Sequence, residues 1–226
     1  MDRFRKTVYN VNQEKEDLTV GKGWFPMADK RTMITKTAVK DGMLELLSKT
    51  SFQYVTVSAL CREAGVGRAT FYTHYTGLTD VIDELAEDAI QATKRAKAPG
   101  FAGIVELAGR MRETTDPAAL APYMELLPVC QRVADNPKYK VLFRDPFVSE
   151  YMLMNIYRRE REHILPFLTK NYNLSPEQAD KIFLFSVTGA FAVNRAMGWK
   201  KDESWYQVQK ALLTFLEGGY QALSRL

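Results

Sequence analysis

The sequence has few of the side chains that catalysis and metal binding use. It contains 2 cysteines and 2 histidines in 226 residues. Cys61 and Cys130 form no C-x-x-C pair, and no H-E-x-x-H joins the histidines. Gly65-Val66-Gly67 lacks the third glycine and the preceding strand of a nucleotide-binding loop. We therefore expect two free, buried thiols, no catalytic site, no metal site and no cofactor.

Long apolar runs are also absent. No stretch approaches the roughly 20 apolar residues that span a bilayer, and the polar residues 1–20 contain no apolar core of a secretory signal peptide. Hydrophobic residues make up 46% of the chain and charged residues 26%, which is ordinary for a protein with a buried core. We expect a cytoplasmic protein with no membrane partner.

The net charge of +4 is small, but it is unevenly distributed. Residues 30–79 contain seven Lys and Arg against three acidic residues, and an acidic run follows at 80–88. A basic surface confined to about fifty residues suits a local DNA contact. On charge alone, a helix face covered by salt bridges is an equally good interpretation.

Hydrophobic residues recur every three or four positions over most of the chain, which predicts an all-α fold. Residues 1–29 lack this period. They are predicted to be a flexible arm, which either follows a DNA groove or lies upstream of the natural translation start. Residues 30–78 form a compact helical unit, and residues 79–97 form a connecting helix. Proline and glycine at 99–100 end that helix, so residues 98–226 form a second helical domain.

Residues 56–75 predict two short helices that meet at a glycine turn. Thr56 is suited to cap the first helix, and Gly65 is suited to end it in the left-handed conformation. The second helix begins near Gly67. Two helices joined in this way form a helix-turn-helix, which presents the start of its second helix to the major groove of DNA.

The stretch from Lys36 to Leu85 resembles the TetR family of bacterial regulators. The family pattern is matched at Thr56-Val57, Ala64-Gly65-Val66 and Phe71-Tyr72-Thr73-His74-Tyr75. The resemblance implies an N-terminal three-helix DNA-binding domain and a C-terminal ligand-binding and dimerisation domain. It also implies a homodimer that binds a palindromic operator in double-stranded DNA, acts as a repressor, and is released by a small-molecule effector.

The resemblance places the DNA contacts in the helix-turn-helix. Arg68 suits a guanine edge and Ala69 a thymine methyl, while hydroxyl groups suit phosphate oxygens. For His74, a packed ring is the alternative to a phosphate contact. The predicted DNA-binding residues are Thr56, Ser58, Arg68, Ala69, Thr70, Tyr72, Thr73 and His74.

Two departures from the family pattern bear on DNA binding. Leu78 stands where the family usually has a lysine that contacts a phosphate, and Asp80 brings a negative charge close to that position. Operator binding is therefore expected to be weaker or more sensitive to salt. The main alternative is a TetR-like co-regulator or ligand-binding protein that does not bind DNA directly. An enzyme is the second alternative, and it would need clustered acids, bases or metal ligands that the sequence does not display.

Within residues 98–226 the resemblance assigns roles by position only. The last two helices are predicted to pair in a dimer, and the core of a single protomer is the alternative for their apolar residues. The predicted interface residues are Phe183, Val187, Phe191, Leu212, Phe215, Leu216 and Tyr220. The middle helices are predicted to enclose the effector, and ordinary packing is the alternative for each aromatic or methionine. The predicted pocket residues are Met111, Tyr123, Phe143, Phe147, Tyr151 and Met154.

The resemblance also implies how an effector acts on DNA binding. An effector bound between the middle helices would move the fourth helix of the chain. That movement would change the separation of the two recognition helices in the dimer. Because two half-sites lie about 34–36 Å apart on DNA, a shift of a few ångströms would weaken binding.

Overall fold

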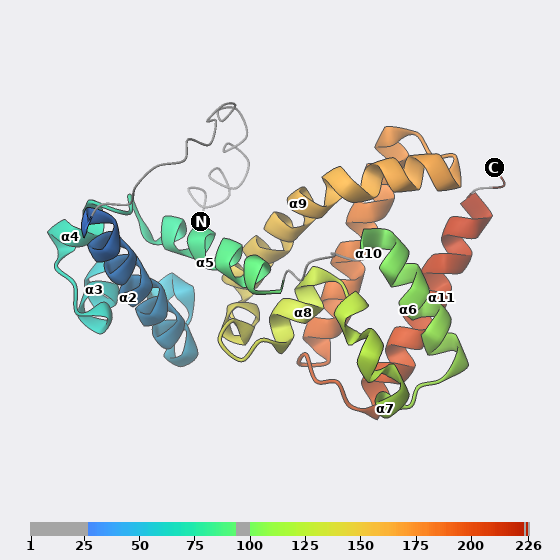
Figure 1. The fold of residues 1–226 in the computed structure, drawn as a ribbon, viewed down its shortest axis with the longest axis horizontal. Coiled ribbons are helices and arrows are strands. Elements are labelled where there is room, and N and C mark those ends of the chain that lie inside the picture. The colour runs from blue at the N-terminus through green and yellow to red at the C-terminus, as the bar shows by residue number, and fades with distance from the viewer. Residues whose placement is uncertain (1–26, 94–99, 224, 226) are drawn as a thin grey trace.

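The computed structural model describes residues 27–93, 100–223 and 225 (Figure 1). Within these ranges the chain is helical and contains no strand, so the all-α prediction is confirmed. Most of the predicted arm, residues 1–26, lies outside the described residues. Its last three residues are helical, because the first described helix begins at Met27. None of the described helices has both the length and the apolar character needed to cross a membrane.

The N-terminal unit lies at one end of the molecule (Figure 1). It consists of α2 (Met27–Lys49), α3 (Val57–Ala64) and α4 (Arg68–Tyr72), with a short 3-10 helix, η1 (Phe52–Tyr54), between α2 and α3. Helices α2 and α3 approach closely at Gly42, where an added Cβ would lie 3.3 Å from the Cβ of Ala64. A glycine in α2 therefore permits the close contact that this pair of helices makes.

The buried face of α2 differs in part from the face that the spacing of its apolar residues predicts, which contains Ile34, Ala38, Met43, Leu44, Leu46 and Leu47. Met43, Leu44 and Leu47 are buried, but Ile34 is 62% exposed, and the fully buried Val39 was not part of the predicted face. Ile34 lies nearer the helix start than Val39, the first residue of α2 that enters the hydrophobic core. Apolar residues at helical spacing therefore begin one turn closer to the start of α2 than its buried residues do.

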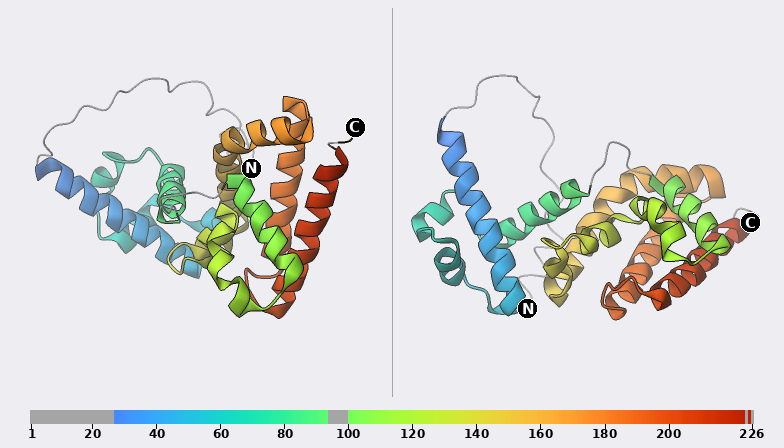
Figure 2. Two further views of the ribbon diagram at one scale, coloured as in Figure 1. Left: turned by 45° about the vertical axis from the view of Figure 1, so that its right-hand side comes forward. Right: turned by 60° about the horizontal axis from the view of Figure 1, so that its bottom comes forward.

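Helix α5 (Leu78–Ala92) joins this unit to the rest of the chain (Figure 2). Apolar residues at helical spacing predict its buried face, and Val81, Ile82, Leu85 and Ile90 of that face are all buried. The predicted connecting helix ended at residue 97, whereas α5 ends at Ala92 and residues 94–99 lie outside the described residues.

The C-terminal part is a larger group of helices. Helix α6 packs against the long helices α9 and α11, the long helix α10 packs against α9, and shorter helices connect α6 to α9 (Figure 2). The elements are α6 (Gly100–Glu113), α7 (Pro117–Leu120), η2 (Ala121–Leu126), α8 (Val129–Asp135), η3 (Lys140–Phe143), α9 (Pro146–Tyr172), α10 (Pro176–Ala196) and α11 (Glu203–Leu223).

The sequence locates the starts of the last two helices. Ser175 forms a capping box with Gln178 at the start of α10, and Asp202 accepts a hydrogen bond from the Trp205 N–H at the start of α11. Near Pro166 the sequence predicts a helix that is kinked or broken, and the structure shows no break, because α9 continues through Pro166. The side chains on either side, Ile164 and Leu168, are buried in one cluster with residues of α10 and α11, which supports the helix where proline removes a hydrogen bond.

One hydrophobic core runs through both parts of the molecule. It contains buried side chains of α2, α3 and α5 together with side chains of α8, η3 and α9. The free cysteines Cys61 and Cys130 are both buried in it, as expected. The N-terminal unit is therefore packed against the C-terminal helices and is not connected to them only through α5.

Asp145 links the two parts at a single carboxylate. One oxygen accepts hydrogen bonds from the N–H groups of Phe147 (2.9 Å) and Val148 (3.0 Å), which caps α9. The other oxygen accepts from the Ser51 hydroxyl (2.6 Å) and the Phe52 N–H (2.8 Å), between α2 and α3. Burial raises the pKa of Asp145, but these hydrogen bonds outweigh burial, so its pKa lies below 3.8.

We predict that Asp145→Ala lowers the free energy of unfolding by about 3 kcal/mol at pH 7, because four donors in buried or part-buried hydrogen bonds lose their acceptor. The matched control is Asp116→Ala, which removes only the exposed cap of α7 and should cost about 1 kcal/mol. Chemical denaturation followed by circular dichroism measures both.

The same variant has a defined pH dependence. A carboxylate whose pKa is lowered by folding stabilises the protein above its unfolded pKa, and this stabilisation is lost as pH falls through the folded value. The difference between wild type and Asp145→Ala should therefore shrink below about pH 4. A difference that stays constant down to pH 3, or equal effects of the two substitutions at pH 7, would contradict the role given to Asp145.

Candidate nucleic-acid interface

The helix-turn-helix has the local geometry that its sequence predicts. The Thr56 hydroxyl oxygen accepts a hydrogen bond from the Ala59 N–H at 3.1 Å and so caps α3. Gly65 ends α3 in the left-handed conformation, with φ of 65°. After Val66, α4 begins at Arg68 with Gly67 as its N-cap. These local features set the direction in which α4 leaves the turn.

Helix α4 is fixed by one buried side and exposes the other. Phe71 is fully buried, and its ring lies 5.4 Å from the ring of the buried Tyr75. The residues of the first turn, Arg68, Ala69 and Thr70, are all exposed. Because the buried aromatic rings hold α4 in place, the exposed first turn is presented in a fixed orientation.

Seven of the eight predicted DNA-binding residues are exposed to solvent. The eighth, His74, is half-buried, so its ring is partly packed. The Thr73 hydroxyl donates within the helix to the Thr70 carbonyl at 2.6 Å. The exposed residues are Thr56, Ser58, Arg68, Ala69, Thr70, Tyr72 and Thr73.

The lysines of α2 contribute less positive charge to this surface than their number suggests. Three of them form ion pairs, and two of the pairs join α2 to α5. Here the salt-bridge interpretation of the basic segment is the better one. By contrast, Arg62 and Arg68 form no ion pair with any described residue. The paired lysines are Lys36 with Glu84 (2.5 Å), Lys40 with Asp88 (2.5 Å) and Lys49 with Glu45 (2.8 Å).

The start of α5 offers no basic side chain to DNA. Leu78, at the usual lysine position, packs against the core. The Asp80 carboxylate accepts hydrogen bonds from the N–H (2.6 Å) and hydroxyl (2.7 Å) of Thr76, which closes the turn before the helix. The negative charge of Asp80 is therefore used locally, and no lysine side chain extends from this turn.

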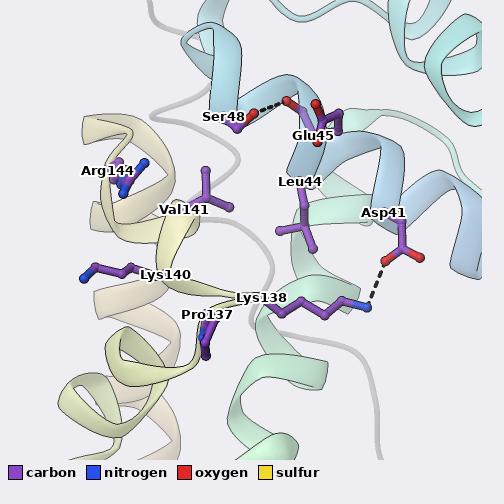
Figure 3. Close-up of a pocket in the computed structure, with 9 residues that line it drawn as sticks. All are labelled: Asp41, Leu44, Glu45, Ser48, Pro137, Lys138, Lys140, Val141 and Arg144. Carbon is purple, nitrogen blue, oxygen red and sulfur yellow. Dashed lines mark hydrogen bonds and ion pairs between the residues drawn. The ribbon is translucent and has the colours of Figure 1, made fainter.

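A cleft of about 430 Å³ lies where the N-terminal unit meets the C-terminal helices (Figure 3). Residues of α2 form one wall, and residues around η3 form the other. Lys138 crosses the cleft, with its Nζ 2.8 Å from Asp41 Oδ1, and this contact raises the pKa of Lys138. Both side chains are about half exposed, so the pair is a weak contact at the edge of the junction.

The C-terminal helices enclose a largely apolar cavity of about 130 Å³. Its walls come from α6, α8, α9, α10 and α11. None of the six side chains predicted to form the effector pocket lines this cavity. The prediction chose aromatic and methionine residues, whereas the cavity is lined chiefly by Ile, Val, Leu and Ala.

Each of the six has another environment in the structure. Met111 and Phe143 are buried in the core, and Met154 packs partly buried in a second cluster. The Tyr151 hydroxyl donates to Asp83 on α5. The remaining two lie near the surface: Tyr123 lies beneath the Arg110 guanidinium, and Phe147 is exposed.

The predicted dimer residues lie in three different environments. Phe183, Phe191 and Tyr220 are buried within the protomer, so the alternative of a protomer core describes them. The half-buried Val187, Leu212 and Leu216 line the apolar cavity. Phe215 alone is largely exposed, at 68%.

The exposed face of the last two helices combines one large aromatic residue on each helix with glycines that permit close helix approach. Phe185 is 64% exposed, and no atom lies within 4 Å of a Cβ built on Gly189, Gly218 or Gly219. On α11, Phe215, Gly218 and Gly219 follow one another at helical spacing. The sequence contains this spacing, but only the packing shows that this side of both helices is left uncovered in the protomer.

Comparisons with known proteins give distant structural matches only. No family model matches the chain, and no curated protein matches it. The solved structure of the dihydroxyacetone kinase operon activator DhaS is 13% identical with a TM-score of 0.44, over 84% of this chain and 98% of that one. The TetR family repressor AlkX from Dietzia sp. strain DQ12-45-1b is 16% identical with a TM-score of 0.36, over 88% of this chain and 98% of that one. Similarity at this level supports no conclusion about function, which depends on the residues of the chain itself.

Proposed function

We propose that the protein is a transcriptional regulator of the TetR type that binds a palindromic operator as a homodimer. The observation that carries this proposal is the first turn of α4. Arg68, Ala69 and Thr70 are exposed there, next to the buried Phe71, and Arg68 has no ion pair with any described residue. A short helix anchored by its aromatic side and open at its start suits the major groove of DNA.

Each exposed group has a suitable partner on DNA. The Arg68 guanidinium can donate two hydrogen bonds to a guanine edge, and the Ala69 methyl can contact a thymine methyl. The hydroxyl groups of Thr56 and Tyr72 can donate to phosphate oxygens, which fixes the register of the protein on the duplex. Because Leu78 supplies no phosphate contact, fewer charges take part in binding than in the usual family pattern.

The homodimer would form through the exposed face of α10 and α11. Phe185 and Phe215 are large apolar side chains left in solvent, and the open glycines beside them allow helices of a second copy to approach closely. Two copies paired in this way would place two recognition helices on one duplex. Control by a small-molecule effector and action as a repressor complete the proposal.

The alternative function is a co-regulator that keeps this fold without binding DNA. The packed Leu78 and the acidic Asp80 beside the helix-turn-helix favour it. The exposed, unpaired Arg68 favours DNA binding. The two functions differ in whether the chain binds DNA in a salt-dependent manner.

We predict salt-dependent binding to DNA from the region upstream of the protein's own gene, measured by fluorescence anisotropy at two salt concentrations. Arg68→Ala should weaken binding about 10-fold or more, because a bidentate contact to guanine is lost. The matched control is Lys200→Ala, which removes an exposed positive charge from the loop between α10 and α11. Equal effects of the two substitutions, or no binding by wild type, would favour the co-regulator.

We predict that Phe215→Glu changes the oligomeric state. The wild type should sediment at about twice the protomer mass of 25.8 kDa, and the variant should sediment as a protomer. Met33→Glu, a substitution at another exposed apolar residue, should remain dimeric. A dimer that survives Phe215→Glu would place the interface elsewhere.

A further inference from the structure

The apolar cavity of the C-terminal helices contains an unusual buried amide. Gln131 lines the cavity and is only 3% exposed. Its Nε2 donates to Gln209 Oε1 at 3.3 Å, but its own Oε1 has no hydrogen-bond partner among the described residues. A buried acceptor without a donor is unfavourable and rare in proteins, so its presence beside a cavity points to a ligand.

The orientation of this amide is held by a chain of polar groups. Gln209 Nε2 donates to Asn194 Oδ1 at 3.5 Å, and Trp205 Nε1 donates to the same oxygen at 2.8 Å. Asn194 in turn donates to the Ala190 carbonyl within α10. Because Gln209 supplies an acceptor to the Nε2 of Gln131, the free atom of Gln131 is its carbonyl oxygen.

The carboxylates at the cavity have positive charges beside them. Glu217 forms an ion pair with Arg112, and Glu160 interacts electrostatically with Arg132. They therefore do not leave a negative site for a cationic ligand, and they disfavour an anionic one. Among the neutral side chains that line the cavity, Gln131 has the buried acceptor without a hydrogen bond to any described residue.

We infer that this cavity binds a small, uncharged, largely apolar molecule that donates one hydrogen bond to Gln131 Oε1. The volume of about 130 Å³ limits the buried part of this molecule to roughly one six-membered ring, since an apolar cavity of about 150 Å³ holds benzene. The apolar walls contact the ring, and the single acceptor selects a hydroxyl or N–H group. This assignment specifies the chemical class of the effector.

The residue after Gln131 connects the cavity to the DNA-binding part. Arg132 Nη1 donates to the Thr93 carbonyl at 2.8 Å, and Thr93 is the C-cap of α5. Successive residues of α8 therefore contact the ligand cavity and the end of the helix that leads to the helix-turn-helix. A shift of α8 on binding would change the contact at Thr93. This step rests on the regulatory function proposed above, whereas binding to the cavity does not.

The cavity is tested without DNA by titrating the full chain with phenol, benzene and anisole, using methyl NMR spectra. Phenol should bind about 3- to 10-fold more tightly than benzene, because it alone donates a hydrogen bond. Anisole, which has no hydrogen-bond donor, should bind no more tightly than benzene. The methyl groups of Ile104, Ile156 and Leu213 should shift, since they line the cavity.

Gln131→Met keeps the length of the side chain and removes the acceptor. Phenol and benzene should then bind equally, whereas the control Gln207→Met, at an exposed position of α11, should keep the preference for phenol. Equal binding of phenol and benzene by wild type would overturn the inference. Tighter binding of benzylammonium than of phenol would also overturn it. The wild-type comparison of phenol with anisole decides the question even if Gln131→Met does not fold.

The coupling is tested on upstream DNA with the cavity saturated by phenol. Wild type should lose at least 2-fold in DNA affinity, and Arg132→Met should lose this response while binding phenol as before. An unchanged DNA affinity at full occupancy would overturn the coupling. If no DNA binds at all, the proposed regulatory function fails, and the NMR comparison still decides whether the cavity binds its ligand class.

Discussion

The Asp145 carboxylate is the interaction on which the arrangement of the two parts depends. It caps α9 with one oxygen and holds the connection between α2 and α3 with the other. A buried acceptor satisfied on both sides fixes the angle between the elements it joins, because moving either element leaves charged oxygen atoms without donors. Helix α4 follows α3 after a three-residue turn, so its position relative to the C-terminal helices depends on this contact.

Two further contacts join the same parts at other points. The Tyr151 hydroxyl donates to Asp83 in the middle of α5, and Arg132 donates to Thr93 at its end. Together with Asp145 they hold the N-terminal unit at one end and α5 along its length. A movement of α8, which lies between the cavity and α5, would therefore change the position of an N-terminal unit that these contacts otherwise hold fixed. This arrangement gives a ligand in the cavity a physical route to α4.

The helix-turn-helix was predictable because its determinants are local. The cap at Thr56, the turn at Gly65 and the buried Phe71 all lie within twenty residues. The cavity and the exposed face of α10 and α11 were not, because burial there is decided by helices far apart in the sequence. Phe183 and Phe215 are the same residue type, and each lies among apolar residues at helical spacing. Phe183 packs against Tyr157 of α9, whereas Phe215 is exposed. Spacing identifies the apolar residues of a helix, and only packing shows which neighbour covers them.

The most direct test of the proposed function is selection from a pool of random DNA sequences with the full-length protein. Two exposed recognition helices related by a dimer axis require a palindrome with half-site centres about 10–10.5 base pairs apart or a multiple of that spacing. Recovery of such a palindrome, with guanine at a position that changes when Arg68 is replaced, is the predicted result. Recovery of no preferred sequence, or of a single unrepeated site, would contradict operator binding by a dimer.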